Sequence, residues 1–400
     1  MRDYREEALE LHKRYQGKLE TTSKIPVESV EDLSLVYSPG VAEPCKEIHE
    51  DEQRMYDYTM KGNTVAVITN GSAVLGLGDI GAKASLPVME GKCMLFKSFA
   101  NVNAFPLCIE ANDTNNFVDI VKSVQAPFGG INLEDIKAPE CFEIEEKLKK
   151  ELDIPVFHDD QHGTAIVTVA GLMNALKLLN KSFSTIKVVI NGAGSAGVAI
   201  VDLLLEFKVN NIIVCDSKGA IYEGREERMN EAKKRVASIT NGQRETGILD
   251  DVINNADVFI GVSAAGALKV NMIKKMNTDP IVFAMANPLP EIMPEEAKDA
   301  GVAVIGTGRS DFPNQVNNVL AFPGIFKGAL AVHAKEINKE MKKAAVYAIA
   351  SLIEDDELRA DYVIPSPFDK RVAQSVADVV SEAAVKSYAT EKIVNLSSIK

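Results

Sequence analysis

From residue 164 onward, short apolar runs alternate with segments whose apolar residues recur at helical spacing. The run 164–179 predicts a long, mostly apolar helix, and further helices are predicted at 195–207 and 225–238. Strands are predicted at the apolar runs 186–192, 211–216, 258–263, 281–287 and 302–308. Short buried strands that alternate with helices are typical of a doubly wound parallel sheet. We therefore expect a domain with such a sheet to begin near residue 160 and its last strand to end near residue 308.

The first part of the chain has a mixed pattern. An amphipathic helix is predicted at 3–15 and another at 141–152, where glutamates precede lysines at helical spacing. The glycine-rich segment 71–92 predicts a loop or a region where the backbone closely approaches another part of the molecule. Buried strands are predicted at 64–70, 93–99, 103–110 and 154–158. Residues from about 323 onward predict helices with one loop at 364–369, and the sequence leaves open whether they pack on the first domain.

Composition and charge narrow the function classes. The 400 residues suggest two domains, and 44 basic and 57 acidic residues give a formal charge of −13. No block of lysine and arginine stands out, so no nucleic-acid partner is expected. No apolar run reaches the roughly 18 residues of a membrane span, and the charged N-terminus does not resemble a secretory signal. The five cysteines are scattered without a C-x-x-C pair, which favours reduced thiols and a cytoplasmic protein.

The stretch VVINGAGSAG, residues 188–197, places a glycine-rich turn between a strand and a helix. Gly192 permits the tight turn, Gly194 lets the backbone approach a pyrophosphate, and Gly197 lets the helix pack close to the strand. The remaining loop positions are Ala193, Ser195 and Ala196. The N–H groups at the start of the helix would face the phosphates. The pattern therefore predicts a Rossmann-like dinucleotide-binding domain.

Asp216 ends the next predicted strand and bears on the choice of cofactor. A carboxylate there can accept hydrogen bonds from both ribose hydroxyls of NAD, and it would repel the 2′-phosphate of NADP. Lys218 follows closely and could hold that phosphate. The sequence therefore favours NAD, with NADP as the alternative. The loop 261–268, after a later strand, is expected to border the nicotinamide.

Two acidic pairs stand in loops beside apolar segments, at residues 134–135 and 159–160. Adjacent carboxylates repel unless a cation or solvent compensates them, and hard ions such as Mg²⁺ and Mn²⁺ take carboxylate oxygens. Asp159 and Asp160 could instead cap the helix that follows. His158 and His162 could be zinc ligands, but no third nitrogen or sulfur ligand has suitable spacing, so a supporting or packing role is favoured.

Together these motifs resemble the malic enzymes, particularly their short bacterial form. The matching segments are VYSPGVA (36–42), LGLGDIGAKASLPVMEGK (75–92), the pair at 134–135, HDDQHGTA (158–165), the nucleotide fingerprint, AMANPLP (284–290) and NNVLAFPG (317–324). They run in order over most of the chain. The resemblance implies an N-terminal α/β substrate and metal domain at 1–158, a Rossmann-like NAD(P) domain at 159–320 and C-terminal helices at 321–400.

The resemblance implies oxidative decarboxylation of L-malate to pyruvate and CO₂ with reduction of NAD(P)⁺. Lys92 matches the general base that takes the proton of the C2 hydroxyl. The lysine must be neutral for this role, and burial together with a nearby cation would favour its neutral form. Tyr37 matches the general acid that protonates C3 of enolpyruvate, and Asp159 would orient the lysine or the ligands. Mg²⁺ or Mn²⁺ would stabilise the enolate at the seam between the domains. The matching ligands are Glu134, Asp135 and Asp160.

Other positions match the family less directly. Asn287, Asn317 and Asn318 match residues that hold the substrate carboxylate or the nicotinamide amide, although loop turns also use asparagine. Thr164 is expected among the cofactor contacts. Lys97 and Asp79 are candidate auxiliaries. The arginine that larger members place before LGLGD is missing from TNGSAVLGLGD, so we expect the carboxylate to be bound differently. The family also implies a homodimer or larger homo-oligomer.

Rival functions on this scaffold make different predictions. A malolactic lyase would keep metal and NAD but release lactate, and an oxaloacetate decarboxylase would cause no net redox change. A non-catalytic nucleotide sensor could lack the lysine, the tyrosine or the acids, all of which are present. An amino-acid or 2-hydroxy-acid dehydrogenase usually needs no divalent metal. Net NADH formation and inhibition by a chelator therefore separate these classes from a malic enzyme.

Overall fold

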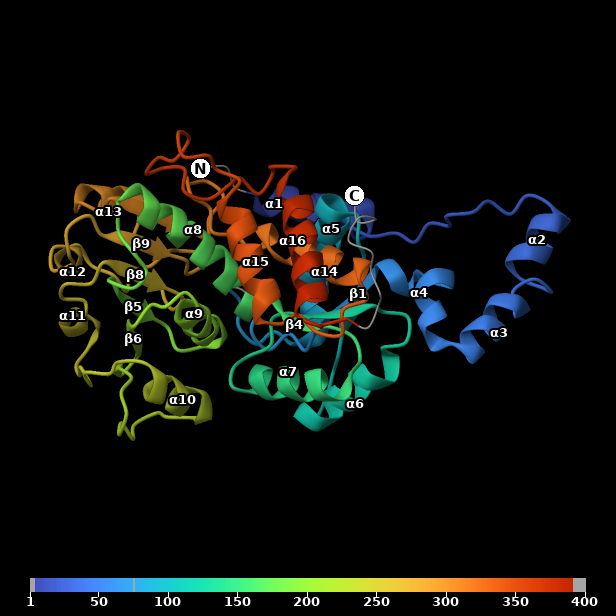
Figure 1. Ribbon diagram of the computed structural model, residues 1–400, viewed down its shortest axis with the longest axis horizontal. Coiled ribbons are helices and arrows are strands. Elements are labelled where there is room, and N and C mark those ends of the chain that lie inside the picture. Colours follow the sequence, from blue (N-terminus) through green and yellow to red (C-terminus); the bar gives the residue numbers. More distant parts are fainter. Residues whose placement is uncertain (1–3, 75, 391–400) are drawn as a thin grey trace.

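The computed structural model describes residues 4–74 and 76–390. It contains two sheets, a group of C-terminal helices and an N-terminal arm (Figure 1). The sheets and the helices around them confirm the predicted α/β class with a doubly wound, mostly parallel sheet in the second half. Residues 391–400 of the predicted C-terminal helical region lie outside the described residues.

The first sheet has four parallel strands in the order β2-β1-β3-β4. These strands are β1 (Thr64–Thr69), β2 (Asn103–Cys108), β3 (Gly130–Leu133) and β4 (Val156–His158). Helix α5 (Gly81–Ala100) covers one face, and α6 (Thr114–Val124) with α7 (Glu140–Glu151) covers the other. Because side chains alternate along a strand, Val65 and Val67 join the core with α5, whereas Ala66 and Ile68 join the core with α6 and α7.

The second sheet has six strands in the order β10-β9-β8-β5-β6-β7, parallel except for the antiparallel edge pair of β6 and β7. They are β5 (Lys187–Asn191), β6 (Asn211–Asp216), β7 (Gly219–Ala220), β8 (Val258–Gly261), β9 (Ile281–Ala284) and β10 (Val304–Thr307). Because β6 and β8 flank β5, the direction of winding reverses at the carboxyl ends of β5 and β8. Open α/β sheets bind their ligands at this kind of switch point.

Helices cover both faces of the second sheet. One face packs against α8 (Thr164–Leu178) and α9 (Ser195–Glu206), with α10 (Glu231–Ile239) beside α9. The other packs against α11 (Leu249–Val252), α12 (Val270–Ile273) and α13 (Pro294–Asp299). Within β5, Val188 and Ile190 face the first group and Val189 faces the second. The apolar strands seen in the sequence are therefore buried on both sides.

The C-terminal helices join the two halves. Helices α14 (Phe322–Ala331), α15 (Lys339–Ala350) and α16 (Val372–Lys386) pack together, and they contact α5 on one side and α8 on the other (Figure 1). Phe96 of α5 packs against Phe322 and Phe326, with ring centroids 4.7 and 5.5 Å apart. One buried cluster includes residues from both sheets and from these helices. Across the described residues, no helix combines the length and apolar character needed to cross a bilayer.

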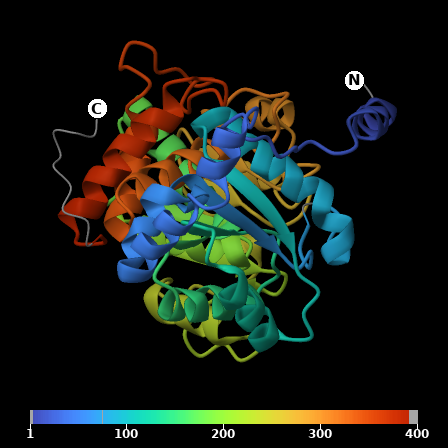
Figure 2. The same ribbon diagram turned by 90° about the vertical axis from the view of Figure 1, so that its right-hand side faces the viewer.

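Residues 4–58 form what we call the N-terminal arm. Its helices are α1 (Arg5–Tyr15), α2 (Val30–Val36), α3 (Ala42–Glu50) and α4 (Met55–Tyr58), with the 3-10 turn η1 (Glu52–Arg54) before α4. A further 3-10 turn, η2 (Met60–Asn63), leads from the arm into β1. None of the residues in α1 to α4 is buried. Figure 1 shows α2 and α3 projecting beyond the rest of the molecule, and Figure 2 shows the first helix standing apart from the body.

Two predicted elements are wrong. Segment 93–99 is not a strand but the last part of α5, which begins at Gly81 inside the predicted loop. Met89, Cys93 and Phe96 are buried at helical spacing, and the continuous apolar run around them hides that period. Helix α10 begins at Glu231 instead of residue 225, because the side chain of Asn230 caps it by accepting a hydrogen bond from a backbone N–H of the first turn.

Candidate active site

A buried lysine lies beside the carboxyl edge of the first sheet. The Lys92 side chain, on α5, is 8 % exposed. Its Nζ donates a hydrogen bond to Glu134 Oε1 at 2.9 Å and another to Asp159 Oδ2. The same ammonium lies 4.0 Å from the ring centroid of Phe322. The lysine therefore joins α5 to the segments that follow β3 and β4 and to the first residue of α14.

The two acidic pairs come together because they follow adjacent parallel strands. Leu133, the last residue of β3, pairs with His158, the last residue of β4. The next residues therefore leave the sheet at the same edge. Carboxylate oxygens from Glu134, Asp135 and Asp160 all lie within 4.8 Å of one another. Three buried or half-buried oxygen donors at this spacing fit a hard divalent ion such as Mg²⁺ or Mn²⁺.

The electrostatics of this group favour a cation. Burial raises the pKa of Glu134, Asp159 and Asp160. Burial lowers the pKa of Lys92, but the charges of Asp159 and Glu134 outweigh it and raise that pKa above its ordinary value. Without a bound metal ion this lysine is therefore a cation, and the neutral state that a general base needs depends on the nearby cation expected from the sequence. A single lysine cannot compensate all the carboxylates, and a divalent ion would supply the missing charge.

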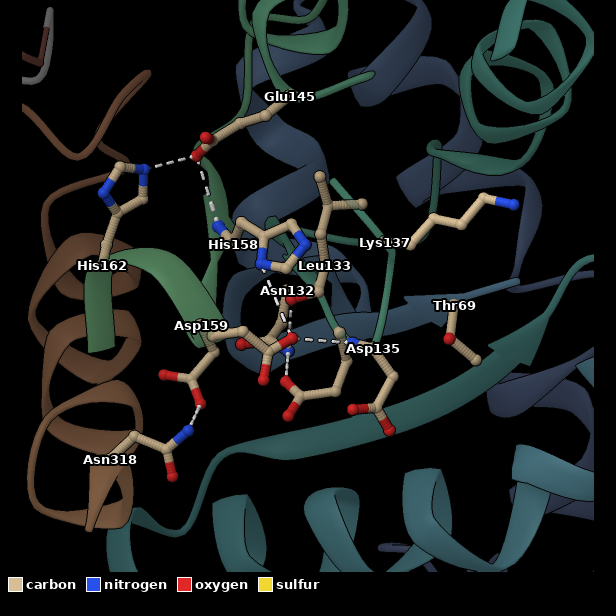
Figure 3. Close-up of polar contacts among 12 residues, drawn as sticks. Thr69, Asn132, Leu133, Asp135, Lys137, Glu145, His158, Asp159, His162 and Asn318 are labelled. Carbon is tan, nitrogen blue, oxygen red and sulfur yellow. Dashed lines mark hydrogen bonds and ion pairs between the residues drawn. The ribbon is translucent and has the colours of Figure 1, made fainter. Parts of the chain in front are cut away.

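Asp159 and Asp160 lie on one π-helical turn, η3 (Asp159–Gly163), which joins β4 to α8. Such turns are rare in proteins overall, but those that occur are frequently found at functional sites. Asp159 is fully buried and also accepts a hydrogen bond from Asn318 Nδ2 (Figure 3). A Cβ added to Gly163 would lie 1.9 Å from Asp159 Oδ1, so the turn needs glycine there. No side chain caps α8, so the aspartates do not serve as the helix caps that their sequence allowed.

The two histidines stand beside the carboxylates. His158 Nδ1 lies 3.7 Å from Asp160 Oδ2, and His162 Nε2 lies 2.8 Å from Glu145 Oε1 (Figure 3). Burial lowers the pKa of both histidines, that of His162 to about 3, so both are neutral. Within residues 4–74 and 76–390, the only group of potential metal ligands consists of the three carboxylates. The zinc alternative therefore gains no support.

A second candidate site is a pocket of about 670 Å³ at the carboxyl edge of the second sheet, between the loops after β5, β6 and β8. Gly192 has a φ of +127°, and a Cβ on Gly197 would lie 1.9 Å from Gly192 O. Nothing lies within 4 Å of the Cβ position of Gly194. Ala193 lines the pocket, and Ser195 and Ala196 begin α9. This geometry suits the tight turn, close packing and open approach expected of a dinucleotide fingerprint.

Two cations hold the Asp216 carboxylate in this pocket. Arg225 Nη2 lies 2.7 and 2.8 Å from its two oxygens, and Lys233 Nζ lies 2.6 Å from Oδ2. The side chain of Lys218 instead pairs with Glu227 at 2.8 Å. Lys233 lines the pocket with Asp216. The negative charge expected to repel a 2′-phosphate is therefore compensated, by residues other than Lys218.

Tyr37 lies away from the carboxylate group of its own chain. It is the C-cap residue of α2 on the N-terminal arm, and it is 68 % exposed. Figure 1 places α2 at the far end of the arm, remote from β4. The structure of a single chain therefore does not bring the predicted general acid to Lys92.

The remaining predicted residues occupy loops and element ends. Asn318 contacts Asp159, whereas Asn317 Oδ1 accepts a hydrogen bond from Val319 N at 3.0 Å and caps the short turn η4 (Asn318–Leu320). Asn287 is half-buried in the loop after β9.

Three further candidates have only local contacts. Thr164 O accepts a hydrogen bond from Thr168 Oγ1, and Lys97 Nζ donates one to Asn103 Oδ1. Exposed Asp79 lies 3.8 Å from Lys137 Nζ.

Sequence reasoning missed several residues that build these sites. Arg225 and Lys233 lie in a charged segment after β6. Only their position a short distance after Asp216 in the sequence could have indicated that they bind its carboxylate. Glu291 is fully buried and accepts hydrogen bonds from the N–H groups of Ser263 and Ala286, both at 3.0 Å. It thereby ties the loop after β8 to the loop after β9. Its signal was an acid inside the otherwise apolar segment NPLPEIMP.

Comparison with known proteins places the chain among enzymes that have these two units. Residues 16–149 match the family model described as malic enzyme, N-terminal domain, and residues 161–385 match malic enzyme, NAD binding domain. A bifunctional malic/malolactic enzyme of Bacillus subtilis is 67 % identical over 383 residues, covering 96 % of this chain and 93 % of that protein. An NAD-dependent malic enzyme of Geobacillus stearothermophilus is 57 % identical, covering 94 % and 78 %. The crystal structure of malic enzyme from Pyrococcus horikoshii superposes with a TM-score of 0.95 at 47 % identity, covering 99 % of this chain and 94 % of that one.

Proposed function

The chain belongs to the malic enzyme family, and we propose on that premise that its carboxylate site makes NAD(P)-linked oxidative decarboxylation of L-malate dependent on a divalent metal. The observation that carries this proposal is the convergence of Glu134, Asp135 and Asp160 beside buried Lys92. Glu134, Asp135 and Asp160 would hold Mg²⁺ or Mn²⁺, whose positive charge would stabilise negative charge that develops on the substrate, and bound NAD(P)⁺ would serve as the hydride acceptor.

Lys92 takes the proton of the C2 hydroxyl in this proposal, and it must first become neutral. Its cationic state depends on Asp159 and Glu134. Glu134 cannot give its full charge to the lysine while it serves as a ligand, so loading of the site lowers the pKa of Lys92. Asp159, held by Lys92 and Asn318, keeps the ammonium group in place. Departure of CO₂ then leaves an enolate, which needs a proton at C3 to become pyruvate.

Tyr37 supplies that proton from a second copy of the chain. Within one chain this tyrosine lies on the projecting arm, whereas Lys92 is buried in the body. Large apolar side chains of the arm are exposed, among them Val30 at 77 % and Leu35 at 74 %. Exposed apolar surface of this kind marks protein interfaces. A symmetric dimer in which each arm reaches the partner's carboxylate site covers these residues and completes both sites.

The pocket around Asp216 accepts NADP as well as NAD. Arg225 and Lys233 together carry one more positive charge than Asp216 removes, and Lys233 lines the pocket. A 2′-phosphate can therefore replace Asp216 as a partner of Lys233 Nζ, while ribose hydroxyls can still donate to Asp216. This assignment changes the sequence-based preference for NAD into use of both cofactors.

The test is absorbance at 340 nm with L-malate and Mn²⁺, run with NAD⁺ and NADP⁺ separately and repeated with EDTA. We expect metal-dependent growth of the signal with equal amounts of pyruvate. Because the Bacillus subtilis relative is named as bifunctional, lactate is assayed in parallel. Lactate without reduced cofactor would favour the malolactic reaction, and no product from folded protein would contradict the proposal.

A further inference from the structure

One buried glutamate contacts both ends of the turn that carries Asp159 and Asp160. Glu145 lies on α7 and is 6 % exposed. Its Oε1 accepts a hydrogen bond from the backbone N–H of His158 at 3.3 Å, immediately before the turn. The same oxygen accepts one from His162 Nε2 at 2.8 Å, near the end of the turn (Figure 3). A single carboxylate oxygen therefore fixes the two ends of η3.

Two lysines hold this glutamate and the histidine in place. Lys149 Nζ, one turn further along α7, lies 2.6 Å from Glu145 Oε1. Lys342 Nζ, on α15, lies 3.0 Å from His162 Nδ1. A carboxylate only accepts hydrogen bonds, so neutral His162 has its proton on Nε2, and its Nδ1 can accept from Lys342 Nζ. The chain of contacts runs from α15 through His162 to α7.

The contacts leave the two aspartates little freedom. Asp159 is held by Lys92 and Asn318 on the side of the turn that faces α5 and η4. Asp160 accepts a hydrogen bond from the backbone of Asp135 at 2.8 Å. These contacts hold the two aspartate side chains. Glu145 adds one contact at each end of η3, to the backbone N–H of His158 and to the ring of His162.

We propose that Glu145 is a positioning residue for the metal site, holding η3 so that Asp160 meets Glu134 and Asp135 while Asp159 meets Lys92. The inference rests on the proposed function, since it assumes that the three carboxylates bind a divalent ion. His162 acts with Glu145 to hold the end of the turn. This gives His162, the second histidine of the HDDQHG segment, a role other than metal ligation. Lys342 holds His162 from the opposite side.

The test is the dissociation constant of Mn²⁺, measured by electron paramagnetic resonance of the free ion without malate. Partners that orient metal ligands contribute about 10–100-fold to metal affinity, so we expect Glu145→Ala to raise the dissociation constant by about that factor. Glu145→Gln keeps an oxygen acceptor and should fall between the wild type and Glu145→Ala. The matched control is Glu146→Gln, the next residue on α7, which is exposed and pairs with Lys150. It should bind Mn²⁺ like the wild type.

The outcomes separate this inference from the proposed function. A wild-type protein that binds no Mn²⁺ would contradict the metal site itself. If the wild type binds Mn²⁺ and a folded Glu145→Gln or Glu145→Ala variant binds it with the same dissociation constant, the positioning role is overturned. Thermal unfolding and NAD⁺ binding are measured on each variant, because a purely structural defect lowers the melting temperature without changing Mn²⁺ affinity in the folded protein. If Glu145→Ala does not fold, Glu145→Gln decides the question.

Discussion

The carboxylate site and the N-terminal arm both contain residues that the family motifs single out, yet their surroundings are opposite. Lys92 and Asp159 are buried, and each has more than one polar partner within the chain. Tyr37 is exposed, on a segment whose helices contain no buried residue. The carboxylate site is held by contacts within one chain, whereas in the dimer we propose Tyr37 would be completed by contacts with a second chain. Under the proposed function, the catalytic residues are therefore divided between a buried part of one chain and an exposed part of another.

We expect the largest effect, a fall in kcat, when the lysine of the buried site is removed. General acid–base groups contribute about 10²–10⁴-fold to rate, so Lys92→Ala should lower kcat by that factor in the 340 nm assay. Lys83→Ala is the control, since this lysine lies on the same helix with an 87 % exposed side chain. A Lys92→Ala enzyme with near wild-type kcat would remove the lysine from the mechanism.

Mixing two inactive variants tests directly whether the arm acts on its own chain. Tyr37→Phe and Lys92→Ala are each purified, unfolded together and refolded as a mixture. If the arm reaches the partner, about half of the dimers are mixed and each has one complete site, so about a quarter of wild-type activity returns. If each arm serves its own chain, no mixed dimer has a complete site and activity stays at the level of the single variants. That result would confine the tyrosine to its own subunit.

A methyl group at Gly163 tests how tightly the body holds its carboxylates. Its Cβ would meet Asp159 Oδ1 at 1.9 Å, and overpacking of this kind costs about 1–3 kcal/mol. We expect Gly163→Ala to lower the free energy of unfolding by that amount in urea, and to lower kcat because Asp159 is displaced from Lys92. Gly242→Ala is the control, because nothing lies within 4 Å of its Cβ position. Equal stability of the two variants would mean that η3 adapts easily.

The most selective expected effect, confined to one cofactor, lies in the nucleotide pocket, which belongs to the body alone. Removing one charge-assisted contact costs about 1.5–3 kcal/mol, so Lys233→Ala should raise the KM for NADP⁺ by about tenfold or more. The KM for NAD⁺ should change much less. Lys234→Ala is the control, as its side chain is exposed and pairs with Glu231. A rise of the same size for both cofactors would exclude Lys233 as the residue that recognises the phosphate.

Sequence reasoning recovered the second domain well because its signals are local. Each strand there is a short apolar run followed by a turn, and Gly192 and Gly197 stand where the backbone requires glycine. The strand predicted at 93–99 was wrong because Cys93 and Phe96 lie in a continuous apolar run, in which period two and period 3.6 look alike. In the site, the acidic pairs meet because they follow the neighbouring strands β3 and β4; β3 was not predicted, and only the family resemblance had placed the two pairs in one site. Glu145 and Lys233 were missed because their site partners lie on other elements, His158 and His162 at β4 and η3 for Glu145 and Asp216 at the end of β6 for Lys233.

The position of Tyr37 on an exposed arm also has a consequence for how the enzyme responds to dilution. If two chains must meet to build one complete site, activity per chain is a property of the pair and falls when pairs separate. Initial rate plotted against protein concentration should then curve upward at low concentration and become linear once pairing is complete. A straight line through the lowest measurable concentrations would require either a very tight dimer or an arm that folds back on its own chain. Subunit exchange between tagged and untagged protein separates those two cases.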